Sequence, residues 1–131
     1  MKAEARPRVL LADDYPGIVV ALERLLSPEC DVVATVTDGG GVSEACHSSQ
    51  PDVVVLDLNM PNVGGLDVCR QLLQTVPQVR VILLSADTSA LVRERALSLG
   101  AFAVVAKQQL TELLLSRIKD AMHDSAGTPQ R

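Results

Sequence analysis

Five polar residues with complementary chemistry stand directly after short apolar runs in this sequence. Asp13 and Asp14 follow the first run, Asp57 the third, Ser85 the fourth and Lys107 the fifth. Three carboxylates that lie close together repel one another and raise each other's pKa unless a cation lies between them. Mg²⁺ typically takes one or two protein carboxylates together with waters and a phosphate oxygen. Residues of these types, brought to one place, predict a magnesium site for phosphoryl chemistry.

Asp57 could be the nucleophile of such a site, because a carboxylate can attack phosphorus and form an acyl phosphate. The Lys107 ammonium and the Ser85 hydroxyl would then bind the remaining phosphoryl oxygens. Taken singly, each residue has an ordinary explanation. An Asp pair or a Ser after a strand can cap a helix, an Asp can stand in a turn, and most lysines lie at the surface. Only their common position after apolar runs favours a site.

The apolar runs themselves predict the strands that would position these side chains. They are too short for buried helices and too continuous for strands with one wet face, which indicates strands buried on both faces. The runs span residues 9–12, 32–36, 53–56, 79–84 and, more weakly, 101–106.

Apolar residues between the runs recur at steps of three and four, which predicts helices. The first helix follows Pro16, the fourth runs from about Thr88 to about Ser98 and stops at Gly100, and the last runs from about Thr111 to about Met122. The second helix has the faintest pattern because three glycines, 39–41, loosen its start. The residues expected to face the core are Ile18, Ala21, Leu22, Leu25, Leu26, Val42, Ala45, Cys46, Leu66, Cys69, Leu72, Leu73, Leu91, Ala96, Leu99, Leu110, Leu113, Leu114 and Ile118.

Alternation of five strands with five helices predicts one doubly wound α/β domain. Ligands of such folds bind beyond the carboxyl ends of the strands, where the five polar residues would meet. We expect residues 1–124 to form this domain and residues 125–131 to be a flexible tail or the start of a linker.

Composition narrows the function further. The 131 residues carry a formal net charge of −4, and Arg6, Arg8, Arg93 and Arg95 make no basic stripe, so we expect no direct binding of DNA by this segment. Cys30, Cys46 and Cys69 have no ligand-like spacing and favour free thiols in a reducing compartment. No signal peptide and no apolar run of membrane-spanning length is present, which predicts a cytoplasmic protein with no membrane partner.

Several motifs together carry a resemblance to a known family. They are Leu11-Ala12-Asp13-Asp14-Tyr15-Pro16, the block PDVVVLDLNMP from Pro51 to Pro61, Gly64-Gly65-Leu66, Ser85-Ala86, and Gly100-Ala101 through Lys107. Over roughly residues 7–123 the chain resembles the CheY-like receiver domains of bacterial two-component response regulators. It is most similar to the subfamily with a C-terminal LuxR/NarL-type helix-turn-helix, although Tyr15-Pro16 stands where that subfamily commonly has His-Pro.

The resemblance implies a flavodoxin-like (βα)₅ fold with strand order 2-1-3-4-5, and a role for each site residue. Asp57 would be the phosphoacceptor, and Ser85 and Lys107 would contact the phosphoryl group. Mg²⁺ would be held by Asp13, Asp14, Asp57 and the backbone carbonyl of Asn59.

It also implies partners and an output. A phosphohistidine on a sensor histidine kinase would be the donor, and the chain would catalyse only its own phosphorylation and dephosphorylation. Phosphorylation would switch the surface of the fourth helix, fifth strand and fifth helix. The output would be transcription through a domain absent from this chain, or an isolated receiver could act alone by docking another protein. Pairing into a homodimer is compatible with the family.

Two positions depart from the family pattern. Val104 stands where an aromatic ring usually turns inward on phosphorylation; Phe102 lies two residues earlier and, by strand alternation, is expected on the same face. Gln108 stands where a proline often follows the lysine.

Three other functions remain open from the residues. A receiver that binds partners regardless of phosphorylation is motivated by Val104 and Gln108. An aspartyl phosphohydrolase generally needs a further acid where this chain has Asn59. A nucleotide- or flavin-binding domain would need a glycine-rich phosphate loop after the first strand, where two acids stand instead.

Overall fold

A computed structural model of the chain describes residues 6–60, 63–86 and 89–123. Strands and helices alternate along it, with a short 3₁₀ turn before α2 and irregular helical turns before α5. The elements are β1 (Arg8–Ala12), α1 (Pro16–Leu26), β2 (Asp31–Val36), η1 (Gly39–Gly41), α2 (Val42–Ser49), β3 (Val53–Asp57), α3 (Gly65–Thr75), β4 (Arg80–Ser85), α4 (Ala90–Ser98), β5 (Ala103–Ala106), η2 (Lys107–Gln109), η3 (Leu110–Leu114) and α5 (Leu115–His123).

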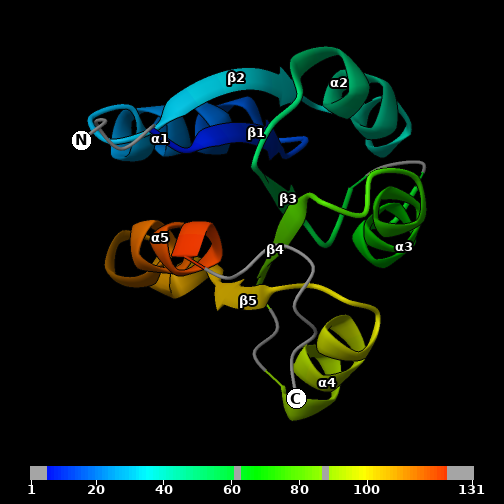
Figure 1. Ribbon diagram of the computed structural model, residues 1–131. Coiled ribbons are helices and arrows are strands. Elements are labelled where there is room, and N and C mark those ends of the chain that lie inside the picture. Colours follow the sequence, from blue (N-terminus) through cyan, green and yellow to red (C-terminus); the bar gives the residue numbers. More distant parts are fainter. Residues whose placement is uncertain (1–5, 61–62, 87–88, 124–131) are drawn as a thin grey trace.

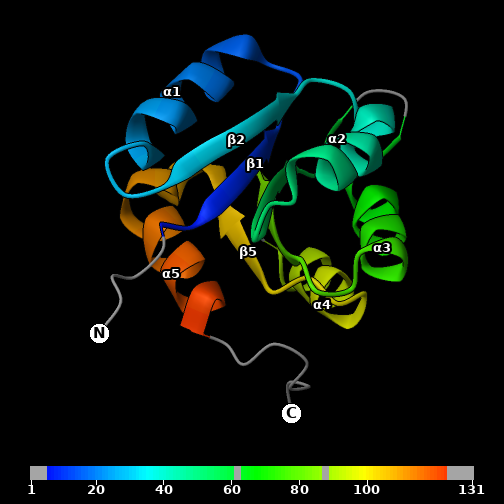
Figure 2. The same cartoon turned by 45° about the horizontal axis from the view of Figure 1, so that its top comes forward.

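The strands form one parallel sheet in the order β2-β1-β3-β4-β5, as the family resemblance implied. Helices α1 and α5 cover one face of the sheet, and α2, α3 and α4 cover the other (Figures 1 and 2). Parallel pairing places the carboxyl ends of neighbouring strands at one edge: Asp57 pairs with Leu84, and Ser85 with Ala106. The residues that follow the strands are therefore neighbours in space.

The core consists of two apolar layers, one on each face of the sheet. Leu10, Val54 and Leu83 belong to the layer under α2, α3 and α4, whereas Leu11 and Val55 belong to the layer under α1 and α5. Every side chain of β3 is buried, because this central strand has neighbours on both sides and helices on both faces. Continuous apolar runs are the sequence signature of such strands.

β2 corrects the prediction that all strands are buried on both faces. Asp31 and Thr35 are exposed, and the four other residues of β2 are only partly buried. β2 stands at one edge of the sheet beside β1, but β5 at the other edge is buried at every residue, so edge position permits this exposure without requiring it. An apolar run alone does not distinguish a central strand from an edge strand.

The helices keep most of the expected inward-facing residues, with two corrections. In α1, Val19 is buried and Ala21 is exposed. In α4, Leu91 is 74% exposed, and the helix rests on Ala96 with Val92 and Leu99 partly buried beside it. Val92, Ala96 and Leu99 follow steps of four and three, so they share one face, whereas Leu91 lies one position away from it.

Phe102 corrects a second expectation. It precedes β5 and packs with the layer under α1 and α5, whereas Val104 belongs to the opposite layer. Strand alternation was the basis for placing both on one face, but regular β5 geometry begins only at Ala103, which lies in the same layer as Phe102. Phe102 therefore does not substitute for the missing aromatic ring at position 104.

The last helix has an irregular first part. Residues Lys107–Gln109 form a 3₁₀ turn and Leu110–Leu114 a π-helical turn before regular α5 begins. The helix expected over 111–122 therefore exists, but its first turn is wider than an α-helical turn. The predicted start of α4 at Thr88 lies outside the described residues; α4 is observed from Ala90, with the Ser89 hydroxyl accepting the Val92 N–H at 3.3 Å.

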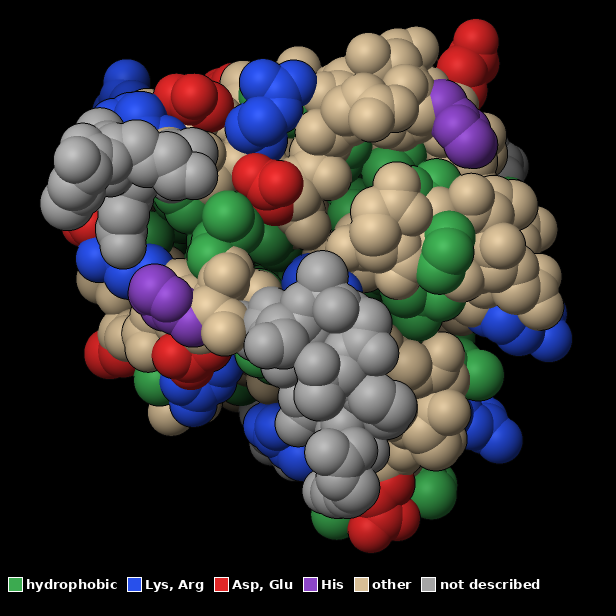
Figure 3. Space-filling view, in the orientation of Figure 1, with side chains coloured by type: hydrophobic (Ala, Val, Ile, Leu, Met, Phe, Trp, Pro, Cys, Tyr) green, Lys and Arg blue, Asp and Glu red, His purple; other side chains and the backbone are tan. Residues whose placement is uncertain are grey.

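The remaining expectations concern cysteines, surface charge and the tail. Cys30, Cys46 and Cys69 are free and buried, and burial raises the pKa of Cys69 to about 11. On the face seen in Figure 3, Lys and Arg side chains are scattered among acidic ones and make no continuous stripe. No helix of the described residues is long and apolar enough to cross a membrane. The tail predicted over 125–131 lies outside the described residues.

Candidate functional site

Asp13 lies immediately after β1 and is fully buried. Its N–H donates to the Val36 carbonyl at 3.0 Å, and its Oδ1 accepts the Tyr15 N–H at 2.9 Å. These two bonds fix the carboxyl group at the carboxyl edge of the sheet. Asp14, by contrast, is exposed at the rim of the same edge.

Asp57 is the last residue of β3 and is 2% exposed. Its Oδ1 accepts the Asn59 N–H at 3.2 Å and lies 3.1 Å from Lys107 Nζ. Both contacts hold one carboxylate oxygen. The side chain therefore points into the site and away from the helices that cover the sheet.

Lys107 follows β5 and connects the two buried acids. Its Nζ lies 3.1 Å from Asp57 Oδ1 and 3.7 Å from Asp13 Oδ2. The lysine side chain is 27% exposed, whereas the two carboxylates are almost completely buried. A single positive charge thus faces two negative charges in a region of low water access, which leaves the site short of positive charge.

The third acid completes a group that can hold a metal ion. Asp13, Asp14 and Asp57 each offer one carboxylate oxygen, and these oxygens lie within 4.8 Å of one another. Asp13 Oδ2 is buried without a hydrogen-bond partner. Burial raises the pKa of the Asp13 carboxyl; the Tyr15 N–H offsets part of this rise, and the Asp57 charge adds to it. A hard divalent cation would supply the missing charge and ligand, so these residues fit Mg²⁺.

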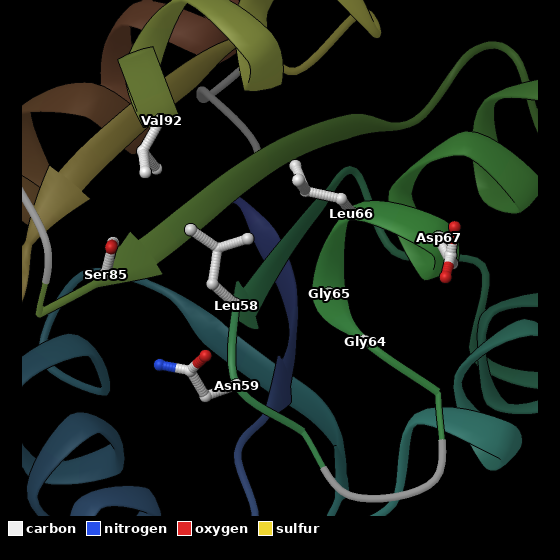
Figure 4. A pocket seen from close by; sticks show the side chains of 8 residues that line it. All are labelled: Leu58, Asn59, Gly64, Gly65, Leu66, Asp67, Ser85 and Val92. Carbon is white, nitrogen blue, oxygen red and sulfur yellow. The ribbon is translucent and has the colours of Figure 1, made fainter. Parts of the chain in front are cut away.

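Ser85 ends β4 beside this group and is 2% exposed. It lines an open hollow of about 420 Å³ between β3, β4, α3 and α4 (Figure 4). Leu58 and Asn59 enter the hollow from the end of β3, and Val92 points into it from α4. The hollow thus extends from Asn59 and Ser85, at the carboxyl edge of the sheet, to Val92 of α4.

A model of the response regulator receiver domain matches residues 9–119. This chain belongs to that family. The five polar residues named from the sequence lie at the carboxyl edge of its sheet, with the three acids and Lys107 gathered there.

Individual relatives support the assignment of this chain to the receiver family. The transcriptional regulatory protein DegU of Brevibacillus brevis is 30% identical over 118 residues, covering 88% of this chain and 50% of DegU. PrrA of Mycobacterium tuberculosis is 34% identical over 122 residues, covering 93% of this chain and 52% of PrrA. The receiver spans about half the length of these curated relatives.

Solved structures show the same fold. The response regulator domain of Thermotoga maritima CheB has a TM-score of 0.85 at 28% identity, covering 92% of this chain and 99% of that one. The receiver domain of NarL from Mycobacterium tuberculosis has a TM-score of 0.79 at 28% identity, covering 88% and 98%. The predicted family and the predicted flavodoxin-like fold are thereby confirmed.

Two residues that the sequence motifs include, Tyr15 and Gly65, were given no role in the site of this receiver. The backbone N–H of Tyr15 orients Asp13, although the sequence pointed to Tyr15 only as an unusual side chain. Gly65 lies against the backbone that follows Asp57, as described below. A backbone donor leaves no trace in residue type. The pair Gly64-Gly65, in contrast, was a sequence signal for a close approach of the backbone.

Proposed function

We propose that this receiver accepts a phosphoryl group on Asp57 from a phosphohistidine of a sensor histidine kinase, in a reaction that requires Mg²⁺. The observation that carries the proposal is the buried Asp57 carboxylate, which lies beside two further acids and 3.1 Å from Lys107 Nζ. Structural carboxylates are rarely buried in such company, because like charges disfavour the ionised form.

The chain's own residues supply the positions that the transfer needs. Lys107 and the Asn59 N–H hold Oδ1 of Asp57, which leaves Oδ2 as the attacking oxygen. A bond forms between this oxygen and phosphorus, the phosphorus–nitrogen bond to the kinase imidazole breaks, and that nitrogen keeps the electron pair. A bound Mg²⁺, held by Asp13, Asp14, Asp57 and the Asn59 carbonyl, would neutralise charge on the phosphoryl oxygens. Lys107 and Ser85 bind those oxygens afterwards.

The phosphoryl group then changes the output surface through its charge. It adds nearly two negative charges beside Lys107 and Ser85. Ser85 moves toward the new oxygens and draws the end of β4 with it, and α4 follows into the hollow lined by Leu58 and Val92. α4 is suited to this movement because Ala96 is the one residue of the helix that is fully buried. The surface of α4, β5 and α5 thereby shifts between two populated states.

The output of this switch is transcription, through a DNA-binding domain outside this chain. DegU and PrrA are transcriptional regulators about twice as long as the matched segment, which supports the proposal. The formal net charge of −4 argues against DNA binding by the receiver itself.

A second candidate is a receiver that binds its partner without phosphorylation. The observation in its favour is Val104, which fills its core position and leaves no ring to turn inward. In that case the acid group would be a remnant and Asp57 would not be modified.

Labelling with a small acyl phosphate and Mg²⁺ tests the proposal. Mass spectrometry of the intact chain should show the gain of one phosphoryl group in wild type and none in Asp57→Asn. Asp120→Asn, which changes an exposed aspartate paired with Arg117, is the matched control and should label like wild type. Labelling that persists in Asp57→Asn excludes Asp57 as the acceptor, and unlabelled wild type favours the second candidate.

A further inference from the structure

Gly65 lies so close to the phosphoacceptor backbone that no side chain fits there. A Cβ at this position would lie 2.6 Å from the Asp57 carbonyl oxygen and 2.6 Å from Leu58 Cα. The Gly65 N–H also donates to the Leu58 carbonyl at 2.9 Å. The first residue of α3 therefore rests directly on the chain that carries Asp57.

Gly39 makes a second close approach, against residues at the start of α3. A Cβ at Gly39 would lie 2.5 Å from the Val63 carbonyl oxygen and 3.2 Å from Val68 Cγ2. The turn η1 that contains it is held in shape by Asp38, whose Oδ1 accepts the Gly40 N–H at 2.7 Å. The turn between β2 and α2 thus rests on residues at and just before the start of α3.

Neighbouring glycines in the same two segments have no such short distances to the facing backbone, so the close approach is local. A Cβ at Gly64 would meet nothing within 4 Å, and one at Gly41 would make an ordinary contact of 3.5 Å with Val36 Cγ1. Both have backbone angles that alanine adopts without strain: Gly64 is extended and Gly41 helical. Among the glycines that the structure describes, only Gly39 and Gly65 stand where a Cβ would meet a main-chain atom within 3 Å.

We propose that Gly39 and Gly65 form a glycine spacer that positions the phosphoacceptor strand end. Through direct contact, Gly65 sets how closely α3 packs on Asp57 and Leu58. Gly39 sets how closely the turn η1 packs on the start of α3. The inference rests on the proposed function, since it assigns these glycines to the geometry of that site. They are positioning residues and touch neither metal nor phosphoryl group.

The physical reason is that packed interiors transmit small displacements instead of absorbing them. An added methyl group at either position must move the backbone, because the nearest atom that it meets is a main-chain carbonyl oxygen. Metal and phosphoryl sites need their groups within about 0.5 Å of the working geometry. A misplacement of about 1 Å can slow a reaction on the order of 100-fold. A shift of Asp57 relative to Asp13 and Lys107 should therefore weaken Mg²⁺ binding and slow phosphorylation.

Four alanine variants in matched pairs test the spacer. Gly65→Ala is compared with Gly64→Ala, and Gly39→Ala with Gly41→Ala. Two properties are measured on the folded protein: Mg²⁺ affinity, from amide NMR shifts without a phosphodonor, and the rate of acyl-phosphate labelling at saturating Mg²⁺. We expect Gly65→Ala to weaken Mg²⁺ binding roughly 10-fold and to slow labelling roughly 100-fold. Gly39→Ala should change both in the same direction by several-fold, and the two controls by less than about twofold.

A merely structural role predicts a different result. Gly65→Ala and Gly39→Ala would then lower the urea midpoint of unfolding while the folded molecules kept wild-type Mg²⁺ affinity and labelling rate. That outcome overturns the inference. If wild type labels on Asp57 while both matched pairs behave alike, the spacer is wrong and the proposed function stands. If wild type does not label at all, the proposed function has failed first.

Asp38 offers a test that adds no atoms, should an alanine variant not fold. Asp38→Ala removes the acceptor of the Gly40 N–H and loosens η1, so it should weaken Mg²⁺ binding and slow labelling by several-fold. Asp38→Asn loses the same charge but keeps an acceptor oxygen, so it should restore most of both. Equal behaviour of Asp38→Ala and wild type overturns the role of this turn. Equal loss in both variants assigns the effect to charge and also overturns it.

Discussion

The two ends of the sheet treat their charged residues in opposite ways. At the amino end, Arg6 donates to the carbonyls of Ser27, Pro28 and Cys30 at 2.6–3.2 Å and pairs with Asp31 at 2.8 Å. These carbonyls follow the last turn of α1, where helical hydrogen bonds run out.

Arg8 acts in the same manner after α2. Its side chain donates to the carbonyls of Ser49 and Gln50, and its N–H donates to Asp52 Oδ2 at 3.0 Å. Each of these two arginines thus donates hydrogen bonds to carbonyl groups that lack a partner within the helix. Charge at this end of the sheet serves the fold.

The carboxyl end leaves bonding capacity unused. Asp13 Oδ2 is buried without a hydrogen-bond partner, and one lysine faces two buried carboxylates. An unsatisfied buried polar group destabilises a fold by about 1–3 kcal/mol. The contrast rests on charge: two buried carboxylates share one lysine at the carboxyl edge, which indicates an edge suited to a ligand that brings positive charge. Three substitutions sharpen or break this comparison.

Lys107→Met should have the largest effect on stability. It leaves Asp13 and Asp57 buried without their shared cation, and removing one partner of a buried pair is strongly destabilising. We expect the free energy of unfolding in EDTA to fall by about 2–3 kcal/mol, less than for a fully buried pair because Lys107 is partly exposed. Added Mg²⁺ should restore most of this loss by supplying the missing positive charge. Urea unfolding followed by circular dichroism, with and without Mg²⁺, measures both.

The matched control for this substitution is Lys119→Met. Lys119 pairs with Glu29 at 2.6 Å, but both side chains are about half exposed, so the loss should stay below about 1 kcal/mol and should not respond to Mg²⁺. Equal losses in the two variants would show that the carboxyl end is no more strained than the surface.

Asp13→Asn should stabilise the metal-free protein. Burial raises the folded-state pKa of Asp13, so the stability contributed by its neutral form is present below the unfolded pKa and is lost as the pH rises through the folded pKa. At pH 7 the substitution removes that loss, and we expect a gain of about 1–2 kcal/mol. The gain should shrink as the pH falls from 7 toward 4, because the raised pKa lets Asp13 take up a proton as the pH falls. Thermal or urea unfolding in EDTA at the two pH values measures the difference.

The same variant should lose function while it gains stability. Its Mg²⁺ affinity should fall roughly 10-fold or more, because a ligand of the acid group is gone. Asp31→Asn at the amino end is the control: it weakens the pair with Arg6, so it should slightly destabilise the fold and leave Mg²⁺ binding unchanged. A loss of stability in Asp13→Asn would show that this carboxylate is held as well as those at the other end.

The sequence anticipated the carboxyl end better than the amino end, for a physical reason. Asp13, Asp57, Ser85 and Lys107 each follow an apolar run, and parallel pairing must bring such positions to one edge. The strand order and the family were predicted from the resemblance that the motifs around these residues carry. Arg6 and Arg8 carried no comparable signal, because the carbonyls that they cap belong to the backbone of residues of any type.

Other features depend on details that periodicity does not encode. The side of the sheet on which Phe102 packs depends on where regular strand geometry begins, and Leu91 points outward because α4 rests on Val92, Ala96 and Leu99. The need for glycine at position 39 depends on a contact with Val63, which lies 24 positions further along the chain. Such contacts are set by how the helices pack, and they become visible only once the layers are assembled.

Arg6→Met at the amino end should have the smallest effect on stability of the three substitutions, and it should leave the site unchanged. Loss of its hydrogen bonds to three carbonyls should lower the free energy of unfolding by about 1 kcal/mol, since the side chain is half exposed and water replaces part of each bond. Arg70→Met, which removes an exposed pair within α3, should lower it by less than about 0.5 kcal/mol. Neither variant should change Mg²⁺ affinity or the rate of Asp57 labelling by more than about twofold, because the amino end contributes no ligand to the site. A weaker Mg²⁺ affinity in Arg6→Met would mean that the arginine contacts also position the carboxyl edge, and the division between a stabilising end and a functional end would then be wrong.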